Sequence, residues 1–310
     1  MFLGIVLRPA LPKLGDRLDR VRLADLVTPD GQSHREGCIG DLGPDDQIAL
    51  QGCSRAFWAR RSGVRCQVAY WQREPPCIQG RFYLGLRWFQ RRFDSILTYD
   101  QNLLSDVPST RFVAHGGCWI DDPSAAGNKR KREAVSLIAS PKRLTEGHRL
   151  RHQIIDWARQ RELPLSAYGK QYQPLSDKRS ALEPFRFSVV IENMRTSNYF
   201  TEKLIDCFVC GCIPIYWGTP EIARFFDPDG MVVCSSEGEI RSAIESTTPE
   251  NFESRRSALE ANRRRALRFV DYHQHVFDAL RGHGILSSDR DVPKSIDSSF
   301  RRQRATVGSP

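Results

Sequence analysis

Long hydrophobic runs are missing from this sequence of 310 residues. No apolar stretch approaches the roughly 18 residues that a membrane-spanning helix needs. The N-terminal MFLGIVLRPALP is apolar over only a few residues and has no basic region before them. We therefore predict a first β-strand there rather than a signal peptide. These absences lead us to expect a cytosolic protein, either free or bound at the inner face of the membrane.

A second cysteine pair, or a Cys/His pair, that would complete a zinc site is also missing. The chain has nine cysteines, an odd and scattered set, and without a secretion signal we expect reduced thiols. Cys207, Cys210 and Cys212 lie close together, but no second Cys or Cys/His pair at the spacing of a zinc site accompanies them. We expect these three thiols to be small buried groups near a helix end, and we predict no metal site.

Acidic residues are fewer than basic ones, 37 against 46, which gives a net charge of +9. A basic balance favours anionic partners such as nucleotides, nucleic acid or anionic membranes, although a solvated basic surface explains the same excess. No RNA- or DNA-binding motif is present, and the basic residues are not interleaved with aromatic ones. We therefore expect no nucleic-acid partner, while a nucleic-acid binder remains an alternative function.

Internal repeats are absent, and short apolar runs alternate with helix-like segments, which is typical of an α/β fold. Several of the runs are continuously apolar, as expected for parallel strands buried on both faces. The candidate strands are Leu3–Leu7, Val64–Trp71, Ser95–Tyr99, Arg111–Ala114, Ala134–Ala139, Phe187–Ile191, Ile213–Trp217 and Met231–Cys234.

The composition predicts two halves, residues 1–125 and 126–285, followed by a polar, mobile tail over 286–310. The segment Pro123–Glu133 mixes small residues with a basic run and is typical of a loop or an interdomain linker. A final helix within Glu250–Leu280 could return to the first half. Two such α/β halves would leave a ligand cleft at the carboxyl ends of their strands.

The stretch SNYFTEKLIDCFVCGCIPIYWGTPE, Ser197–Glu221, predicts a loop, a helix and a strand. Its apolar stripe at helical spacing consists of Leu204, Ile205, Phe208 and Val209, and Gly211 suits the end of the helix. Further helices are predicted to start at Thr219-Pro220-Glu221, where Pro fits the first helical position, and at Ser236, where Glu239 completes a capping box.

Glu202 and Lys203 fall in the first turn of the helix predicted within this stretch, at the carboxyl edge of the sheet. Free N–H groups and the partial positive charge of a helix N-terminus attract phosphate, and Lys203 adds a full charge beside them. Glu202 can accept hydrogen bonds from hydroxyl groups, such as those of a ribose. The alternative is a capping acid followed by a solvated lysine.

The longer segment FRFSVVIENMRTSNYFTEKLIDCFVCGCIPIYWGTPEIARFFDPDGMVV resembles the C-terminal signature of the α-1,3-fucosyltransferase family, glycosyltransferase family 10. The matching elements are Glu192-Asn193, the Tyr199–Lys203 motif, and the strand Ile213–Trp217 with Gly218 and Pro220 after it. The segment looks like the bacterial, soluble branch without a membrane anchor. The resemblance implies a GT-B fold, an α/β architecture of two Rossmann-like domains that face each other across a cleft. It also implies a GDP-sugar donor, usually GDP-fucose, bound by the C-terminal half, and a glycan acceptor.

The resemblance further implies which residues bind the sugar donor. Asn193, Tyr199, Glu202 and Lys203 match the family's donor-binding positions, with Lys203 on the phosphate and Glu202 on the ribose or the sugar. Arg151 aligns best with the family's phosphate-binding arginine, a role that suits its planar fork. Two neighbours compete for that role, Arg143 and Arg149.

The family's general base is a glutamate in the N-terminal half, and its nearest counterpart here is Glu74 in VAYWQREPPCI. The context differs from the family's Gly-Glu-Asn, so an ordinary loop carboxylate is the alternative for Glu74. His115, in a loop that we assign to the cleft, is an acceptor-side candidate, with a structural histidine as the alternative.

These residues predict an inverting displacement in which Glu74 takes the proton of the acceptor while Arg151 and Lys203 stabilise the departing diphosphate. No covalent intermediate and no resident metal is required, and a divalent cation, Mn²⁺ or Mg²⁺, that assists the diphosphate stays open. Alternatives that also stay open are a GT-B transferase for another nucleotide sugar and a non-catalytic sugar-nucleotide binder.

Overall fold

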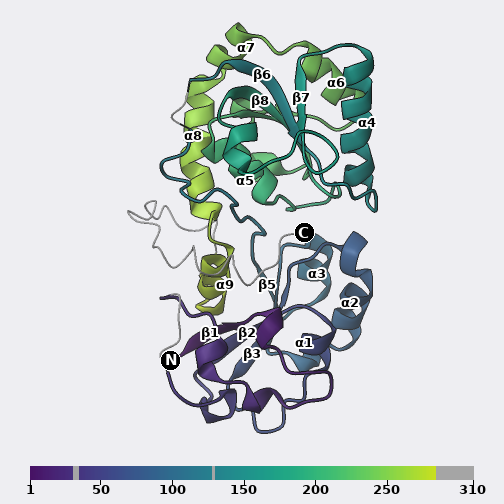
Figure 1. The fold of residues 1–310 in the computed structure, drawn as a ribbon. Coiled ribbons are helices and arrows are strands. Elements are labelled where there is room, and N and C mark those ends of the chain that lie inside the picture. The colour runs from purple at the N-terminus through teal and green to yellow at the C-terminus, as the bar shows by residue number, and fades with distance from the viewer. Residues whose placement is uncertain (31–34, 128–129, 284–310) are drawn as a thin grey trace. The chain divides into compact units, whose positions relative to one another are not determined.

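The computed structural model describes residues 1–30, 35–127 and 130–283, and they form two compact units (Figure 1). Among the described residues, unit 1 comprises 1–114 and 272–283, and unit 2 comprises 115–271. The division therefore lies at 114–115 and not at 125–126, and the predicted tail over 286–310 lies outside the described residues. The described residues of Pro123–Glu133 lie within unit 2, so of the two predicted alternatives this segment is a loop and not an interdomain linker. Its Lys131 Nζ donates a hydrogen bond to the carbonyl oxygen of Cys210 in the same unit.

Unit 1 contains a sheet of five parallel strands in the order β1-β2-β3-β4-β5. The strands are β1 (Leu3–Val6), β2 (Gln47–Gln51), β3 (Gln67–Gln72), β4 (Ser95–Thr98) and β5 (Thr110–Phe112). Four of them fall in predicted strands. The exception is β2, which has only three consecutive apolar residues between two glutamines.

Helices cover both faces of this sheet, because alternate residues of each strand point to opposite faces. On one face, Ile48, Val68 and Ile96 pack against α1 (Ser54–Trp58), α2 (Pro76–Trp88) and α3 (Gln101–Asp106). On the other face, Ile5, Ala69 and Leu97 pack against α9 (Tyr272–Leu280). The last helix thus completes the core of unit 1. This confirms the expectation that a final helix returns to the first half, whereas the predicted domain boundaries had left it within residues 126–285.

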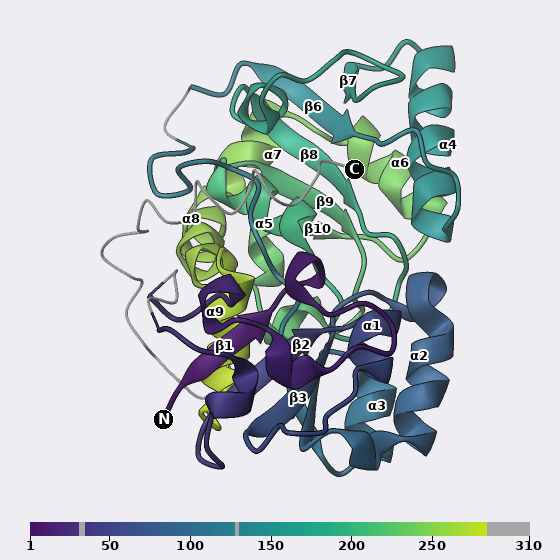
Figure 2. The same cartoon turned by 60° about the horizontal axis from the view of Figure 1, so that its bottom comes forward.

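Unit 2 contains a second sheet of five parallel strands, in the order β10-β9-β8-β6-β7. Figures 1 and 2 show α4 and α6 on one face of this sheet and α5 and α8 on the other. The strands are β6 (Glu133–Ile138), β7 (Leu165–Tyr168), β8 (Phe185–Ile191), β9 (Ile213–Trp217) and β10 (Val232–Val233). The helices are α4 (Glu146–Gln160), α5 (Glu202–Val209), α6 (Glu237–Glu245), α7 (Pro249–Ser254) and α8 (Arg256–Ala266).

The predicted loop, helix and strand of residues 197–221 are present. Helix α5 begins after Thr201, whose side chain accepts a hydrogen bond from the Lys203 N–H. It is followed by Gly211, which has a φ of +68°, a left-handed conformation that glycine adopts at low cost. Helix α6 begins after Ser236, whose Oγ accepts from the Glu239 N–H at 3.2 Å, as the capping-box spacing predicted.

The prediction that a helix starts at Thr219 is wrong. The Thr219 hydroxyl accepts a hydrogen bond from the Asn198 N–H at 2.9 Å and lies 3.0 Å from the Glu221 carboxylate. Because that side chain is used to hold the preceding loop, it does not cap a helix. A short 3₁₀ turn follows instead of an α-helix, at Ile222–Arg224.

Candidate functional site

The order of the strands in unit 2 indicates where a ligand is most favourably bound in this unit. The chain leaves β6 to form the edge strand β7 on one side and returns to form β8 on the other, so the direction of the sheet's growth reverses between β6 and β8. In open parallel sheets, ligands bind at the carboxyl ends of the strands at such a reversal. Here α4 follows β6 and α5 follows β8, so the N-termini of both helices belong to this edge.

The first turn of α4 lies directly against the end of β8. The Gly147 N–H donates a hydrogen bond to the Asn193 carbonyl oxygen at 3.1 Å. A Cβ atom on Gly147 would lie 1.7 Å from the carbonyl oxygen of Glu192, a distance at which any side chain would force the two segments apart. Glycine at this position therefore allows α4 to bring its next residues to the end of β8.

Arg151, one turn further along α4, is 4% exposed and holds the end of β8. Its Nε donates to the Ile191 carbonyl oxygen at 2.9 Å, and its Nη2 donates to Asn193 Oδ1 at 3.1 Å. Burial lowers the pKa of the Arg151 guanidinium, while the charge of Glu192 acts in the opposite direction. Within the described part of the chain, Nη1 makes no hydrogen bond, so this nitrogen remains available to a ligand.

The two competing arginines are placed differently. Arg143 and Arg149 are both exposed, and Arg149 Nη1 donates to the carbonyl oxygens of Arg143 and Leu144 at 3.5 and 3.4 Å. Their side chains therefore lie at the surface, whereas Arg151 is buried in contact with Asn193. This geometry favours Arg151 for the phosphate-binding role.

The N-terminus of α5 carries a network of charged groups. Glu192 is fully buried, and its carboxylate accepts hydrogen bonds from the Thr201 N–H at 2.8 Å and the Thr201 hydroxyl at 2.7 Å. Lys203 Nζ lies 3.0 Å from Glu202 Oε1 and 3.7 Å from Glu192 Oε2. Lys203 is thus the cation that two carboxylates share, and its side chain keeps a quarter of its surface, 26%, in contact with solvent.

The two carboxylates respond to this environment in opposite ways. Burial raises the pKa of Glu192, and the charge of Lys203 offsets only part of that effect. Burial also acts to raise the pKa of Glu202, but the positive charges of Lys203, Lys178 and His115 together hold it well below its usual range. Glu202 is therefore ionised at neutral pH and can accept hydrogen bonds from hydroxyl groups of a ligand.

Tyr199 is buried and packs edge-on against the ring of His115, with 5.6 Å between ring centroids and an interplanar angle of 90°. This contact corrects one expectation. His115 was assigned to the N-terminal, acceptor-side half, but it belongs to unit 2 and lies beside the donor-binding signature. When protonated, the His115 ring adds a positive charge that lowers the pKa of Glu202, a residue of the same signature.

Three residues of the site were not predicted to take part in it. Lys178, in a 3₁₀ turn at Lys178–Ala181, donates to Asp206 Oδ2 at 2.8 Å, and the Trp119 N–H donates to Asp206 Oδ1 at 2.7 Å. The Lys178 ammonium also lies 5.3 Å from the centroid of the Trp119 ring. The sequence could have indicated Asp206, because it lies four residues after Glu202 and therefore on the same side of the helix.

His148 was missed as well, and the charges of Arg151 and Lys203 act on its ring. Its backbone N–H donates to Thr145 Oγ1 at 3.2 Å, and its Nδ1 accepts from the Thr145 N–H at 3.3 Å. The neutral ring therefore carries its proton on Nε2. Burial, followed by the charges of Arg151 and Lys203, lowers the pKa of His148 from 6.5 to about 4.

This lowered pKa predicts a pH dependence of stability. The unfolded chain protonates His148 below about pH 6.5, while the folded chain resists protonation until about pH 4. Stability from the neutral ring is therefore fully present above pH 6.5 and is lost as the pH falls toward 4, by up to about 3 kcal/mol. Urea unfolding of the wild type and of His148→Gln across this range should show the smaller loss in the variant. Equal losses in the two proteins would contradict the assignment.

Glu74 lies in unit 1, in the loop between β3 and α2, and is half-buried. Its carbonyl oxygen accepts hydrogen bonds from Gln72 Nε2 at 2.8 Å and from the Tyr83 hydroxyl at 2.9 Å. These bonds fix its backbone at the carboxyl end of β3. The structure thus assembles Arg151, Asn193, Tyr199, Glu202 and Lys203 within unit 2, and it places Glu74 outside that group.

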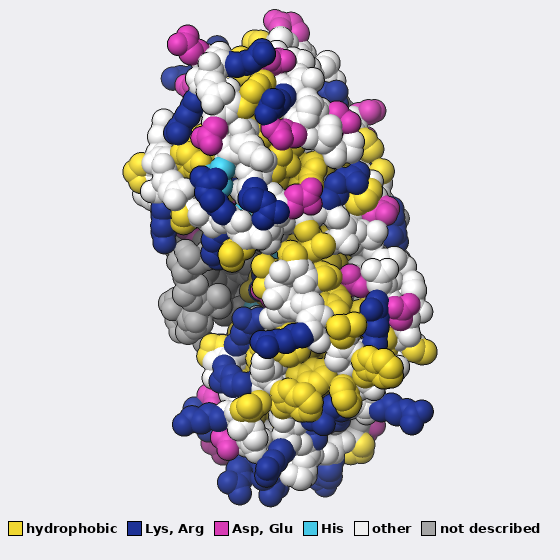
Figure 3. Space-filling model, turned by 90° about the vertical axis from the view of Figure 1, so that its right-hand side faces the viewer, with side chains coloured by type: hydrophobic (Ala, Val, Ile, Leu, Met, Phe, Trp, Pro, Cys, Tyr) yellow, Lys and Arg dark blue, Asp and Glu magenta, His cyan; other side chains and the backbone are white. Residues whose placement is uncertain are grey.

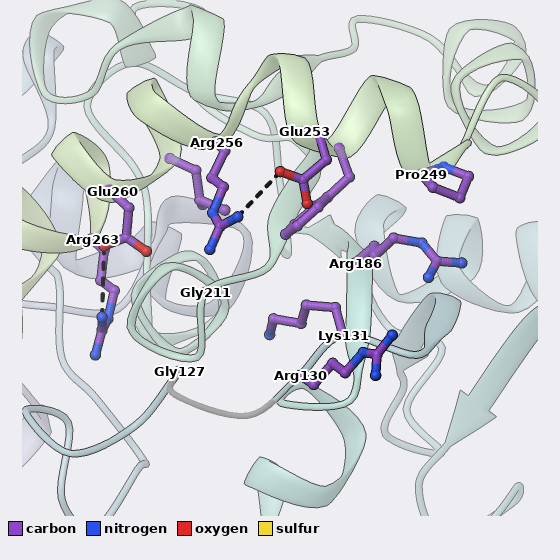
Figure 4. A pocket seen from close by; sticks show the side chains of 12 residues that line it. Gly127, Arg130, Lys131, Arg186, Gly211, Pro249, Glu253, Arg256, Glu260 and Arg263 are labelled. Carbon is purple, nitrogen blue, oxygen red and sulfur yellow. Dashed lines mark hydrogen bonds and ion pairs between the residues drawn. The ribbon is translucent and has the colours of Figure 1, made fainter.

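A basic hollow of about 690 Å³ lies at the opposite, amino edge of the unit 2 sheet (Figure 4). Arg186, at the start of β8, and Arg130 and Lys131, just before β6, line it from one side. From the other side, α7 and α8 contribute two ion pairs, Glu253–Arg256 at 3.2 Å and Glu260–Arg263 at 3.6 Å. Because it lies at the amino ends of the strands, this hollow is separate from the site at their carboxyl ends.

The three clustered cysteines, Cys207, Cys210 and Cys212, are buried, and two of their thiols contact backbone carbonyl oxygens. Cys207 Sγ contacts the Cys212 carbonyl oxygen at 3.5 Å, and Cys212 Sγ contacts that of Leu182 at 2.8 Å. None of the nine cysteines, all of which lie in the described ranges, forms a disulfide.

Over residues 1–30, 35–127 and 130–283, no group of three or more His, Cys, Asp or Glu side chains is arranged to hold a metal ion. No described helix combines the length and apolarity needed to cross a membrane.

A family model matches part of the chain that lies in unit 2. Residues 128–237 match the family model of glycosyltransferase family 10 (fucosyltransferase), C-terminal part. That range contains Arg151, Asn193, Tyr199, Glu202 and Lys203, and it excludes Glu74. The resemblance predicted from the signature is therefore confirmed.

The alignments with two curated relatives cover only a short part of each of those proteins. An α-(1,3)-fucosyltransferase, FucT, of Helicobacter pylori is 38% identical over 58 residues, which are 19% of this chain and 12% of that protein. A putative fucosyltransferase-like protein of Arabidopsis thaliana is 27% identical over 141 residues, 44% of this chain and 26% of that protein. The chain thus spans about a quarter or less of the length of these relatives.

A solved structure covers more of the chain. The structure of an α,α-trehalose 6-phosphate synthase from Burkholderia multivorans aligns with a TM-score of 0.53 at 11% identity. The alignment covers 78% of this chain and 72% of that one. At this identity the likeness concerns the fold, and it confirms the predicted GT-B class with two Rossmann-like domains.

Proposed function

We propose that this chain is an inverting glycosyltransferase that transfers fucose from GDP-fucose to a hydroxyl group of a glycan. One observation carries the proposal. The residues that match the family's donor-binding motif converge on the strand reversal of unit 2, between the N-termini of α4 and α5. That position suits a nucleoside diphosphate, because helix N-termini and cations there oppose its negative charge.

The diphosphate is the part of the sugar donor that this site fits best. Arg151 offers Nη1 from α4, Lys203 offers its ammonium from α5, and the first-turn N–H groups of α5 add partial positive charge. Glu202, held ionised by its neighbours, accepts hydrogen bonds from ribose or sugar hydroxyls. His148 contributes an uncharged Nε2–H in the first turn of α4, and hence a hydrogen-bond donor that needs no proton from solvent.

The proposed reaction is a single displacement. The acceptor oxygen gives its proton to the Glu74 carboxylate and bonds to the anomeric carbon of the fucose. The bond from that carbon to the diphosphate oxygen breaks, its electron pair leaves with GDP from the opposite face, and the configuration inverts. Negative charge develops on the diphosphate, where one well-placed donor is typically worth about 3 kcal/mol of barrier. The reaction as proposed requires no resident metal, and a divalent cation could accompany the diphosphate.

Calorimetry with GDP and UDP tests the choice of nucleotide, and a transfer assay over a panel of nucleotide sugars and glycans tests the choice of sugar. We expect GDP to bind at least about tenfold tighter than UDP, a difference of roughly 1.4 kcal/mol. Tighter binding of UDP would instead support a GT-B transferase for another nucleotide sugar. Binding of GDP without turnover on any acceptor would support a non-catalytic binder.

A further inference from the structure

Unit 1 exposes a group of large apolar side chains at α1, α2 and the residue after α2. Trp58, Leu84, Trp88 and Phe89 have 49%, 58%, 82% and 50% of their surface exposed, and we call them the α1–α2 patch. The rings of Trp58 and Phe89 lie 6.2 Å apart, so the patch is continuous between the ends of the two helices. Figure 3 shows hydrophobic side chains gathered on this face of unit 1, with Lys and Arg side chains around them.

The helical spacing of α2 separates this patch from the core. Phe82, Tyr83 and Leu86 point to the sheet and are buried in the core of unit 1. Arg81, Leu84 and Trp88 follow at i, i+3 and i+7 and form one exposed stripe. The patch is therefore a second apolar face of α2 that unit 1 itself does not cover.

The charges around the patch that lack an ion-pair partner are positive. Residues 76–92 contain four arginines, at 81, 87, 91 and 92, and no Asp or Glu. The neighbouring carboxylates are already paired, Asp106 with Arg87 and Asp94 with Arg61, each at 2.8 Å. Over the described residues, Arg81 and Arg91 form no ion pair, so the patch has an uncompensated positive rim.

We propose that the α1–α2 patch docks unit 1 on a bilayer surface that contains anionic lipids. Tryptophan and phenylalanine beside arginine are the side chains that favour the headgroup region, where the rings enter the apolar boundary and the guanidinium groups meet lipid phosphates. A second copy of this chain is a poorer occupant, because a symmetric contact would bring the same arginines against each other. The inference does not depend on the proposed function, since lipid binding is measured without nucleotide.

Co-sedimentation of the full chain with lipid vesicles tests this proposal. We expect binding to phosphatidylcholine vesicles that contain about a third of phosphatidylglycerol, and binding at least about tenfold weaker to phosphatidylcholine alone. The double variant Leu84→Ser, Trp88→Ser should lose about tenfold or more of the binding to the anionic vesicles. Leu144→Ser is the matched control, because Leu144 is 78% exposed but lies in unit 2.

The rim is tested separately with the double variant Arg81→Gln, Arg91→Gln, which should weaken anionic binding and leave the thermal unfolding temperature unchanged. The proposal is overturned if the wild-type chain does not sediment with anionic vesicles, or if the Leu84→Ser, Trp88→Ser variant sediments equally well. It is also overturned if analytical ultracentrifugation shows a wild-type dimer that this variant dissociates, because the patch would then be an interface between copies.

Discussion

Lys203→Ala is expected to raise the dissociation constant for GDP about 30- to 150-fold, a loss of about 2–3 kcal/mol. The reason is the position of the ammonium at the N-terminus of α5, where it lies 3.0 Å from Glu202 and 3.7 Å from Glu192. Removing it subtracts a cation from the phosphate position and leaves two carboxylates with less compensation. The site then becomes more negative at the place where the diphosphate must bind. Isothermal titration calorimetry with GDP measures the effect.

Guanosine is the control ligand for this prediction, because it lacks the diphosphate. Its affinity should be nearly the same in the variant, which would show that the site remains folded. Lys13→Ala, an exposed lysine of unit 1, is the matched control variant and should bind GDP as the wild type does. An unchanged GDP affinity in Lys203→Ala would mean that Lys203 serves only to neutralise Glu192 and Glu202.

Glu74→Gln should lower kcat about 10²- to 10⁴-fold and leave the dissociation constant for GDP-fucose unchanged. Glutamine has the shape of glutamate but cannot take up the acceptor's proton. The contacts that position this residue come from its backbone carbonyl, which accepts from Gln72 and Tyr83, so the substitution retains them. The measurement is the rate of GDP release, either with an accepted glycan or with water as the acceptor.

The control for this substitution is Glu36→Gln, which changes an exposed glutamate of the same unit by the same atoms. Its kcat should equal that of the wild type. If Glu74→Gln keeps kcat within about threefold of the wild type, Glu74 is an ordinary loop carboxylate and the base lies elsewhere.

The elements that were predictable from sequence are those with a strong local pattern. The apolar stripe of residues 204–209 predicted α5, and continuous apolar runs predicted β8 and β9. The strands β2 and β7 were missed because their patterns are weak. β2 has three apolar residues between glutamines, and β7 is a short edge strand that is mostly half-buried.

Some residues of the candidate site could likewise be predicted from sequence, and others could not. Five candidate residues fall inside the stretch that matches the family, so the resemblance alone could propose them as donor-binding residues: Arg151, Asn193, Tyr199, Glu202 and Lys203. Lys178, Trp119 and His148 reach the site from separate loops and from the first turn of α4, and no local pattern marks a contact between residues so far apart in the chain. His115 was assigned to the wrong unit for the same reason, because the boundary depends on packing and not on composition.

The return of α9 to unit 1 has a consequence for the folding of this protein during its synthesis on the ribosome. The sheet of unit 1 is complete after residue 114, but one of its apolar faces stays bare until α9 emerges. At about 5–20 residues per second, translation of residues 115–271 leaves that face uncovered for about 8 to 30 s. A nascent chain at this stage is a natural client for chaperones, and a dissection of the protein should express 115–271 as one continuous insert while keeping α9 with the N-terminal segment.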